Sequence, residues 1–407
     1  MHPQEIELGL ERVRAAWSRH FSRAIPFPVI TITGTNGKGS VAMLLEAIYR
    51  AAGYRTACYT SPHLVRYNER VRVNGEEVVD EELCRAFERI DAARGDTPLT
   101  YFEFGTLAAM EVFLAANVDV AILEVGLGGR LDAVNLFDAE VAIVTSVGID
   151  HTDWLGPDRE SIGREKAGIF RASRPAICGD PDPPASLNAE ARRVGARLLR
   201  VGHEFELVCH GNDCHWQGPA SARSDLPPPT LAGEHQRRNV ACALMAVAEL
   251  TQRLPVDEAA VRTGLLEVVL PGRLQTVTDS PSTIFDVAHN PQAVEMLTSV
   301  LRAQEVAGKT FAVLGMMQDK AVTECIRIVS AQVDRWFLAS LTPPRGATAA
   351  RLRQALGAVT VDADAREFDT PAEAFRAAQA QASPDDRIVV FGSFETVGGI
   401  MRQLFRQ

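Results

Sequence analysis

The sequence lacks the features that would direct it to a nucleic acid, a membrane or the cell exterior. Acidic residues exceed basic ones, 52 against 42, and the net charge of -10 argues against a large nucleic-acid or anionic-membrane surface. No apolar run is long enough to span a bilayer, and residues 1–7 show no basic region followed by an apolar one. We therefore expect a cytoplasmic protein with no nucleic-acid or membrane partner.

The seven cysteines show no regular disulfide spacing. Most are isolated in apolar or helical context, which is typical of reduced thiols: Cys58, Cys84, Cys178, Cys242 and Cys325. The segment Cys209-His210-Gly-Asn-Asp-Cys214-His215 has metal-ligand residue types, but no second Cys/His pair follows at zinc-finger spacing. We favour a Gly-Asn turn between two short strands there, with zinc as the alternative.

A glycine-rich turn follows a β-branched run near the N-terminus, in Val29-Ile-Thr-Ile-Thr-Gly34-Thr-Asn-Gly-Lys38-Gly-Ser40, and a helix-forming stretch follows it. Glycines let backbone N–H groups converge on phosphate oxygens, and a helix N-terminus and Lys38 add positive charge. Ser40 offers a hydroxyl to magnesium. The pattern departs from G-x-x-x-x-G-K-[ST], because Gly39 separates Lys38 from Ser40. We interpret it as a phosphate-binding loop; an ordinary Gly-rich turn is the alternative.

Apolar runs alternate with helical patterns along the 407 residues, which are enough for two or three domains. Strands apolar on both faces are typical of parallel sheets covered by helices, with ligands at the carboxyl ends of the strands. We predict strands in Val118–Val125, Val141–Val147, Ile284–Ala288, Phe311–Leu314 and Ile388–Gly392, and helices over Gln236–Arg253 and Ala372–Gln381. We expect shorter strands between Cys178 and Pro229, and a domain boundary at Leu270-Pro-Gly-Arg273.

Polar residues follow the predicted strands of the N-terminal part. Ser61 follows the second strand, Glu124 ends another, and His151 follows a third. A buried carboxylate requires a cation, and magnesium prefers carboxylate and hydroxyl oxygens beside nucleotide phosphate. Glu124 with Ser61 or Ser40 fits that role; pairing with an Arg or Lys is the alternative. On its residue type alone, we favour His151 as a hydrogen-bonded structural histidine.

The strands of the C-terminal part end in similar polar groups. Phe285-Asp286-Val-Ala-His289-Asn290-Pro291 ends one strand, and Asn290 is also a good helix cap. Gly315-Met-Met-Gln-Asp319-Lys320 ends the next, and Gly392-Ser393-Phe-Glu-Thr396 ends the last.

Together these motifs resemble the folylpolyglutamate synthase/dihydrofolate synthase family of the Mur ligase superfamily, and most closely its bifunctional bacterial members. The resemblance runs from Leu8 to Val397 and rests on GTNGKGS, SPHLVRYNERVRVNG, TYFEFGT, ILEVGLGGRLDAVN, DHTDWLG, REKAGIF, LPGR, FDVAHNP and GSFETVG. It implies an α/β fold: an N-terminal P-loop ATPase-like domain with a parallel-rich sheet (residues 1–270, ATP-binding) and a smaller C-terminal Rossmann-like α/β domain (residues 271–407, glutamate ligase).

The resemblance also implies the reaction. ATP phosphorylates a substrate carboxylate, and the amine of L-glutamate then attacks the acyl phosphate. The acceptors would be dihydropteroate and reduced folates such as tetrahydrofolate, and the protein would act as a monomer.

Residue roles follow from the resemblance. Catalytic positions would be Lys38, Lys166 and His289, with Lys166 carrying a carbamate. Two Mg²⁺ ions would be held by Ser61, Glu124 and His151. ATP would contact Gly34, Thr35, Asn36, Gly37, Lys38, Gly39, Ser40, Asn239, Arg273, Asp286 and Ser393. From its residues alone, Lys166 would be a solvated helix charge.

The pterin substrate would lie near the N-terminal segment with Gly9 and Arg12, near Phe102, and near Asp132. Phe102 could stack on the flat pterin ring; core packing is the alternative. One departure is visible, because Val134 stands where the family has threonine and a hydroxyl is lost.

Three alternatives remain at this point. The chain could be a single-activity ligase, either folylpolyglutamate synthase or dihydrofolate synthase, or another Mur-type ligase. The chain could also be a binding protein switched by a nucleotide, like a GTPase. That interpretation lacks support, because the sequence has no N-K-x-D string for base recognition and the C-terminal motifs would have no role. ATP turnover that depends on pterin and glutamate would separate a ligase from a switch.

Overall fold

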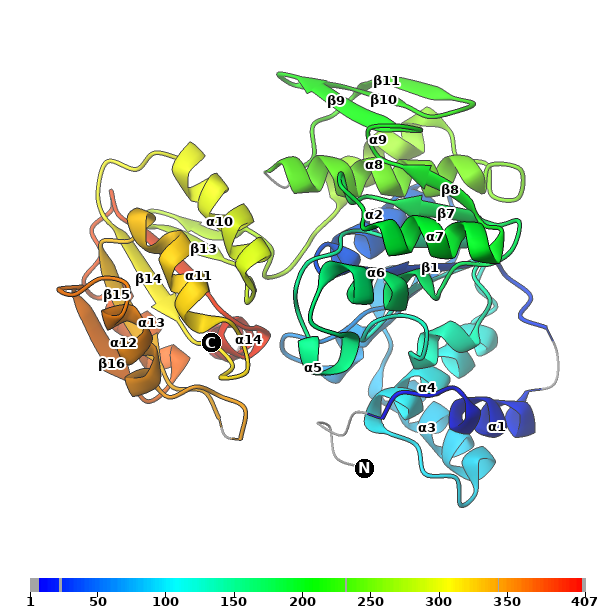
Figure 1. The fold of residues 1–407 in the computed structure, drawn as a ribbon, viewed down its shortest axis with the longest axis horizontal. Helices are drawn as coiled ribbons and strands as arrows, with labels where there is room; N and C mark the ends of the chain where they lie inside the picture. Colours follow the sequence, from blue (N-terminus) through cyan, green and yellow to red (C-terminus); the bar gives the residue numbers. More distant parts are fainter. Residues whose placement is uncertain (1–6, 22–23, 231–232, 343, 405–407) are drawn as a thin grey trace. The chain divides into compact units, whose positions relative to one another are not determined.

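The computed structural model describes residues 7–21, 24–230, 233–342 and 344–404, which form two compact units (Figure 1). The first contains most of the chain up to Val269, and the second begins at Leu270 and includes Leu64–Arg66. Most of the N-terminal segment considered above for a leader, residues 1–6, lies outside the described residues. Within them, no helix is long and apolar enough to cross a membrane.

An eight-stranded sheet forms the centre of the first unit, in the order β4-β3-β2-β5-β1-β6-β7-β8. The strands from β2 to β8 in this order are parallel, and β3 and β4 add an antiparallel edge. The strands are β1 (Val29–Thr33), β2 (Thr56–Tyr59), β3 (Val71–Val73), β4 (Glu76–Glu77), β5 (Val120–Glu124), β6 (Val141–Val144), β7 (Pro175–Cys178) and β8 (Arg197–Arg200).

Helices cover both faces of this sheet, so its central strands are buried throughout. Alternate strand residues pack on one face against α1 (Glu11–His20), α3 (Asp80–Arg94), α4 (Tyr101–Ala115), α6 (Arg159–Ala167) and α7 (Ala185–Val194). The other face contacts α2 (Lys38–Ala51) and α8 (Glu234–Glu249), and α9 (Glu258–Glu267) packs on α2. Short turns complete the unit: η1 (Tyr67–Arg70), η2 (Ala133–Leu136) and α5 (Thr152–Leu155).

A small antiparallel sheet, in the order β11-β10-β9, lies against α8. β9 (Glu206–His210) and β10 (Asp213–Gln217) form the predicted hairpin, and β11 (Ala222–Leu226) completes the sheet. Trp216 anchors it by donating its indole N–H to the Ala241 carbonyl at 3.3 Å. Cys209 and Cys214 are paired across the hairpin in a disulfide that the sequence analysis did not foresee. The other five cysteines are not in disulfides, as predicted.

A six-stranded sheet forms the second unit, in the order β12-β13-β17-β14-β15-β16, parallel except for β12. The strands are β12 (Gln275–Asp279), β13 (Ser282–Phe285), β14 (Thr310–Leu314), β15 (Arg335–Ala339), β16 (Ala365–Phe368) and β17 (Arg387–Phe391). One face packs on α10 (Pro291–Ala303), α11 (Val322–Val329) and α12 (Ala349–Gly357), and the other on α13 (Pro371–Gln379) and α14 (Phe394–Leu404). A short turn, η3 (Ser330–Gln332), follows α11.

The predicted α/β class is confirmed: all five apolar runs overlap a strand, and both predicted helices form, as α8 and α13. The segment from Cys178 to Pro229 contains the expected short strands, and also α7, which was not predicted. The division into domains 1–270 and 271–407 remains a prediction, since Leu64–Arg66 packs within the second unit.

Candidate active site

The glycine loop connects β1 to α2 and leaves no room for side chains at two positions. Gly34 and Gly37 have φ values of +153° and +90°. A Cβ on Gly34 would lie 1.9 Å from Oγ1 of Thr145, and one on Gly37 would lie 2.7 Å from Oδ1 of Asn239. Both positions therefore require glycine, and Asn239 of α8 lies directly against the loop.

Hydrogen bonds from the segment after β6 hold the loop in place. The Thr35 hydroxyl accepts a bond from Gly148 N at 2.9 Å. Asn36 N donates to Oγ of Ser146 at 3.1 Å, and Oγ1 of Thr145 donates to the Asn36 carbonyl at 2.6 Å. The loop is thus organised by the protein itself, which is the condition for preorganised electrostatic stabilisation.

Lys38 begins α2 and places its ammonium over this loop. Its Nζ donates to the carbonyls of Gly34 at 3.0 Å and Thr35 at 3.4 Å. Ser40 is buried in the first turn of the same helix. The loop, the helix N-terminus and the ammonium therefore occupy one place at the carboxyl edge of the sheet.

Glu124 ends β5 beside the glycine loop and is 4% exposed. Its Oε2 accepts a bond from Ser61 N at 3.1 Å and would lie 3.7 Å from a Cβ on Gly39. The structure therefore brings Glu124, Ser61 and the loop together, as predicted from the strand ends.

His151 lies in the loop after β6, next to β1 in the sheet order. It has a left-handed φ of +53°, its side chain is 38% exposed, and its Nε2 lies 4.0 Å from Oδ2 of Asp150. Among the described residues, no three His, Cys, Asp or Glu side chains are grouped to hold a metal. A cation at Glu124 would therefore need hydroxyl, water or phosphate oxygens, which is how magnesium usually binds.

Lys166 lies in the last turn of α6 and is 4% exposed, so its description as a solvated helix charge is wrong. Burial, with the charge of Lys38 as a second cause, lowers its pKa to about 7, while Asp150 and Asp132 act in the opposite direction. A substantial fraction of its amine is therefore neutral and nucleophilic near neutral pH.

Asp132 is a buried carboxylate that organises the loop after β5. Its oxygens accept bonds from Leu127 N at 2.8 Å and Val134 N at 3.0 Å. Burial raises its pKa to about 7 against these hydrogen bonds. The loop packs on the end of α6, because a Cβ on Gly129 would lie 2.9 Å from the Lys166 carbonyl.

The two segments predicted to surround the pterin meet on this loop. Gly9 N donates to the Leu131 carbonyl at 3.2 Å. The Phe102 ring lies over Gly126, where a Cβ would be 2.6 Å from the ring. Arg12 joins the segments through an ion pair with Glu103 at 2.9 Å. Phe102 is half-buried and lies 5.9 Å from the Tyr59 ring, so packing and ligand stacking are both compatible with its position.

The second unit gathers a separate polar cluster at the carboxyl ends of β13 and β17. Asp286 accepts bonds from Leu274 N at 2.8 Å and Ala288 N at 2.7 Å, and burial raises its pKa while Arg273 opposes the rise. His289 Nδ1 lies 2.8 Å from the Val287 carbonyl, to which it donates a hydrogen bond.

Phe394 joins this cluster, although the sequence analysis gave it no role. The Arg273 guanidinium lies 4.8 Å above its ring, and the His289 ring lies 6.3 Å away. Ser393 directly precedes α14, and its Oγ accepts a bond from Thr396 N at 3.0 Å. Asn290 caps α10 through Ala293 N at 2.9 Å, which confirms the capping interpretation.

Comparison with known proteins places these features in a family. The family model of the Mur ligase middle domain matches residues 32–247, and that of the Mur ligase glutamate ligase domain matches residues 272–394. The dihydrofolate synthase/folylpolyglutamate synthase of Escherichia coli (strain K12) is 47% identical over 98% of this chain and 92% of its own length. The chain belongs to the dihydrofolate synthase/folylpolyglutamate synthase family of Mur ligases.

Solved structures of this family share the fold. E. coli FolC in complex with DHPP and ADP has a TM-score of 0.94 and 46% identity, covering 100% of this chain and 95% of that one. A bifunctional synthase with Mn, AMPPNP and L-glutamate bound has a TM-score of 0.90 and 45% identity, covering 98% and 95%. In sequence, the dihydrofolate synthase/folylpolyglutamate synthase of Mycobacterium tuberculosis is 32% identical over 98% of this chain and 90% of its own length. The predicted function, a bifunctional ATP-dependent ligase of this family, is thereby confirmed.

The one departure from the family pattern has a structural explanation. Val134 is fully buried in the hydrophobic core of the first unit, and its bond to Asp132 uses the backbone N. The loop geometry therefore does not depend on a hydroxyl at this position.

Three contributors from the segment after β6 were missed by the sequence analysis. Thr145 and Ser146 buttress the glycine loop, and Asp150 acts on Lys166. Each follows β6, so proximity to a strand end was the only available signal. Phe394 carried a similar signal, since it follows directly on Ser393 in the string GSFETVG.

Proposed function

We propose that this protein adds L-glutamate both to dihydropteroate and to reduced folates. A carboxylate of the pterin substrate attacks the γ-phosphorus of ATP, ADP leaves, and an acyl phosphate forms. The amine of glutamate then attacks the acyl carbon, and phosphate leaves as the amide forms. Two relatives are named as both dihydrofolate synthase and folylpolyglutamate synthase, which supports this assignment. Similar structures bound to DHPP and ADP, and to L-glutamate, support it further.

The observation that carries the proposal is the meeting of the glycine loop, Glu124 and Ser61 at one edge of the sheet. A triphosphate and a carboxylate repel each other, so cations must screen both anions while the nucleophile stays in line. A loop organised by protein hydrogen bonds, with an ammonium above it and a buried carboxylate beside it, meets this requirement.

ATP contacts are proposed for Gly34 to Ser40 and Asn239 in the first unit, and for Arg273, Asp286 and Ser393 in the second. Ser61, Glu124 and His151 are proposed to hold two Mg²⁺ ions, which would polarise the phosphoryl oxygens. His289, whose Nδ1 donates to the Val287 carbonyl, is proposed to act in the transfer step. Residues 1–270 are proposed as the ATP-binding domain and residues 271–407 as the glutamate-ligase domain.

Lys166 is proposed to carry a carbamate. Its neutral amine attacks dissolved carbon dioxide, the N–C bond forms, and one proton leaves to solvent. The product is an anion where the unmodified residue is a cation. Burial and a pKa lowered to about 7 favour the neutral amine that this step needs.

The pterin is proposed to lie where the N-terminal segment and α4 meet the loop after β5. Gly9 and Arg12 contribute from one side, Phe102 from another, and Asp132 positions the loop. The protein is proposed to act as a monomer, which sedimentation will test.

The deciding experiment measures ADP release with dihydropteroate, tetrahydrofolate or cell-wall precursors, each with and without glutamate. We expect release only when a pteroyl acceptor and glutamate are both present. Activity with tetrahydrofolate alone would reduce the protein to a folylpolyglutamate synthase. Activity with a cell-wall precursor would assign it to another Mur-type reaction.

Glu124→Gln is expected to raise the magnesium concentration needed for half-maximal activity and to lower turnover, because the amide keeps the shape but loses the charge. The measurement is a magnesium titration at saturating ATP. Glu140→Gln is the control: Glu140 precedes β6 at the opposite edge of the sheet and pairs with Arg174. A magnesium dependence shared by wild type and Glu124→Gln would exclude Glu124 as a ligand.

Phe102→Ala is expected to lower kcat/KM for dihydropteroate about tenfold, since stacking of an aromatic ring contributes about 1.4 kcal/mol. The loss for tetrahydrofolate should be smaller, because a longer substrate places its pterin elsewhere. Phe104→Ala is a matched control on the same helix, because Phe104 stacks on Phe87 at 5.5 Å. Equal losses for both acceptors would make Phe102 a packing residue.

A further inference from the structure

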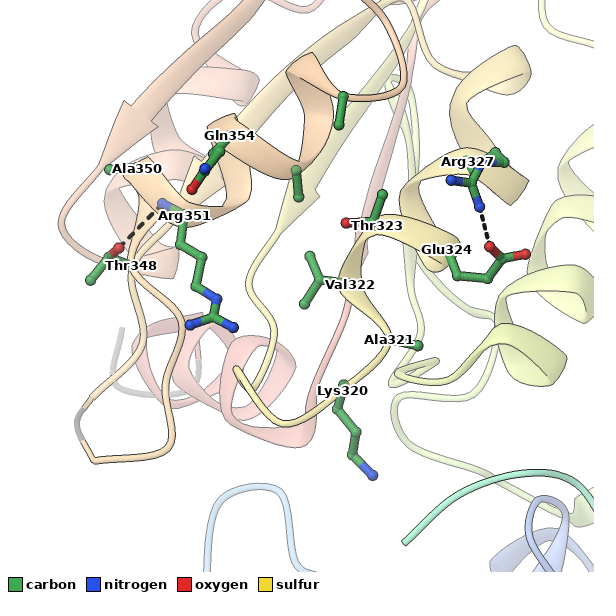
Figure 2. Close-up of a pocket in the computed structure, with 12 residues that line it drawn as sticks. Lys320, Ala321, Val322, Thr323, Glu324, Arg327, Thr348, Ala350, Arg351 and Gln354 are labelled. Atoms are coloured by element: carbon green, nitrogen blue, oxygen red, sulfur yellow. Dashed lines mark hydrogen bonds and ion pairs between the residues drawn. The ribbon is translucent and has the colours of Figure 1, made fainter. Parts of the chain in front are cut away.

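A groove of about 920 Å³ lies between α11 and α12 of the second unit (Figure 2). We call it the α11–α12 groove. Methyl groups of residues such as Val322 and Ala355 line part of it, and three cations, Lys320, Arg327 and Arg351, contribute to its wall. Its volume is within the range of small-molecule sites, about 300–1,000 Å³. The phosphate and metal chemistry proposed above does not use it.

The charge of this groove is predominantly positive. Glu324 is the carboxylate among its described lining residues, and it is paired with Arg327. Arg351 is exposed and makes a long bond of 3.5 Å to the Gln318 carbonyl. Figure 2 shows the side chains of Arg351 and Lys320 extending toward the same end of the groove. That end therefore carries two positive charges.

The same end is connected to the polar cluster of this unit. Lys320 lies in the loop after β14, and that loop begins at Gly315. The Gly315 carbonyl accepts a bond from Oγ1 of Thr396 at 2.7 Å, and Thr396 in turn bonds Ser393. The loop that carries Lys320 therefore lies at the carboxyl edge of the sheet that also carries Ser393 and His289.

The chemistry of the lining favours a chain of carboxylates over a nucleotide. None of its described lining residues is aromatic, so a base would find no stacking partner. A guanidinium pairs well with carboxylate oxygens, and methyl groups can cover the CH₂ groups between successive carboxylates. A γ-linked glutamyl chain has this alternation, with one free α-carboxylate and two CH₂ groups in each residue.

We propose that the α11–α12 groove binds the γ-linked oligoglutamyl tail of folates that already carry several glutamates, with Arg351 and Lys320 pairing with its α-carboxylates. This assignment rests on the proposed function, because a folylpolyglutamate synthase meets such tails as substrate and product. A monoglutamyl folate is too short to depend on the groove. The groove therefore favours longer chains.

The test compares the Kd of tetraglutamyl and monoglutamyl tetrahydrofolate by titration calorimetry, in wild type, Arg351→Gln, Lys320→Gln and the double variant. We expect each single change to weaken tetraglutamate binding about threefold and the double change about tenfold. Monoglutamate binding and turnover should stay within about twofold of wild type, and the tetraglutamate advantage should shrink as salt rises.

Arg353→Gln is the matched control. Arg353 lies on α12 too, but it pairs with Glu367 at 3.2 Å and does not line the groove. A loss caused by damage to the helix would therefore appear in this variant as well.

Three results would overturn the proposal: no tetraglutamate advantage in wild type, equal losses for both folates in the double variant, or abolition of the advantage by inorganic phosphate at matched ionic strength. The last would show an unspecific anion site. Failure of the proposed function is distinct, because it would appear as absent glutamate-dependent ADP release with monoglutamyl folate in wild type.

Discussion

Replacing Lys38 with alanine is expected to lower kcat about a hundredfold or more. The Lys38 ammonium lies over the glycine loop, 3.0 Å from the Gly34 carbonyl, at the point where α2 begins. Loss of a preorganised charge at a phosphoryl-transfer site costs about 3–4 kcal/mol. The loop itself should persist, because its bonds to Thr145, Ser146 and Gly148 do not involve the lysine side chain.

The measurement is steady-state ADP release at saturating ATP, with the thermal midpoint recorded to show that the variant is folded. Lys309→Ala is the control, because Lys309 is exposed and precedes β14, away from the carboxyl ends of the strands. Turnover within about threefold of wild type in the Lys38 variant, less than about 0.7 kcal/mol of barrier, would remove Lys38 from the phosphate site.

Local pattern predicted the part of the site that depends on strand ends. Glu124 and Ser61 were expected together because parallel strands display their carboxyl ends at one edge, and they are joined by a 3.1 Å bond. The glycine loop was also predicted, from glycines between a β-branched run and a helix-forming stretch. The positive φ angles of Gly34 and Gly37 explain why glycine stands there. In both cases the information is carried by a few neighbouring residues.

Burial caused by distant packing could not be predicted in the same way. Lys166 belongs to a helix with many charged residues, and its local sequence suggests an exposed side chain. It is buried because the loop after β5 packs on the end of α6, where Gly129 leaves space for the Lys166 carbonyl. Only the resemblance to a known family singled it out.

Aromatic and hydroxyl partners were missed for a related reason. Phe394 gains a role from Arg273 and His289, which come from the ends of other elements of the second unit. Thr145 and Ser146 act on a loop more than 100 residues away in sequence. A Thr-Ser pair after a strand is common, so nothing in these residues alone indicates their partner.

Lysine itself is scarce in this chain. Of the 42 lysines and arginines in the sequence, four are lysines. Two of the four, Lys38 and Lys166, lie in the proposed site. Arginine cannot replace Lys166, because its guanidinium stays protonated and cannot form a carbamate. At position 38 it would put a planar guanidinium in place of a compact ammonium. A lysine in this arginine-rich chain therefore indicates a position where an amine or a compact charge is needed.

Lys166→Arg and Lys166→Ala are both expected to lose most ligase activity if the modified side chain acts as an anion. Arginine keeps a positive charge but forms no carbamate, and alanine leaves an empty space. Acetate, a short carboxylic acid, is expected to restore part of the activity of the alanine variant and none of that of the arginine variant. Arg164→Gln is the control, because Arg164 is exposed on the same helix.

The same assignment predicts a dependence on carbon dioxide and pH. Burial lowers the pKa of Lys166 to about 7, so the fraction of neutral amine rises as pH increases through that value. Wild-type activity should fall in buffer freed of carbon dioxide and return when carbon dioxide is restored. At equal dissolved carbon dioxide, the return should be faster at about pH 8 than at about pH 6. The alanine variant with acetate should show no such response. Full activity of the arginine variant would instead show that Lys166 acts through its positive charge, since that charge is the property both residues share.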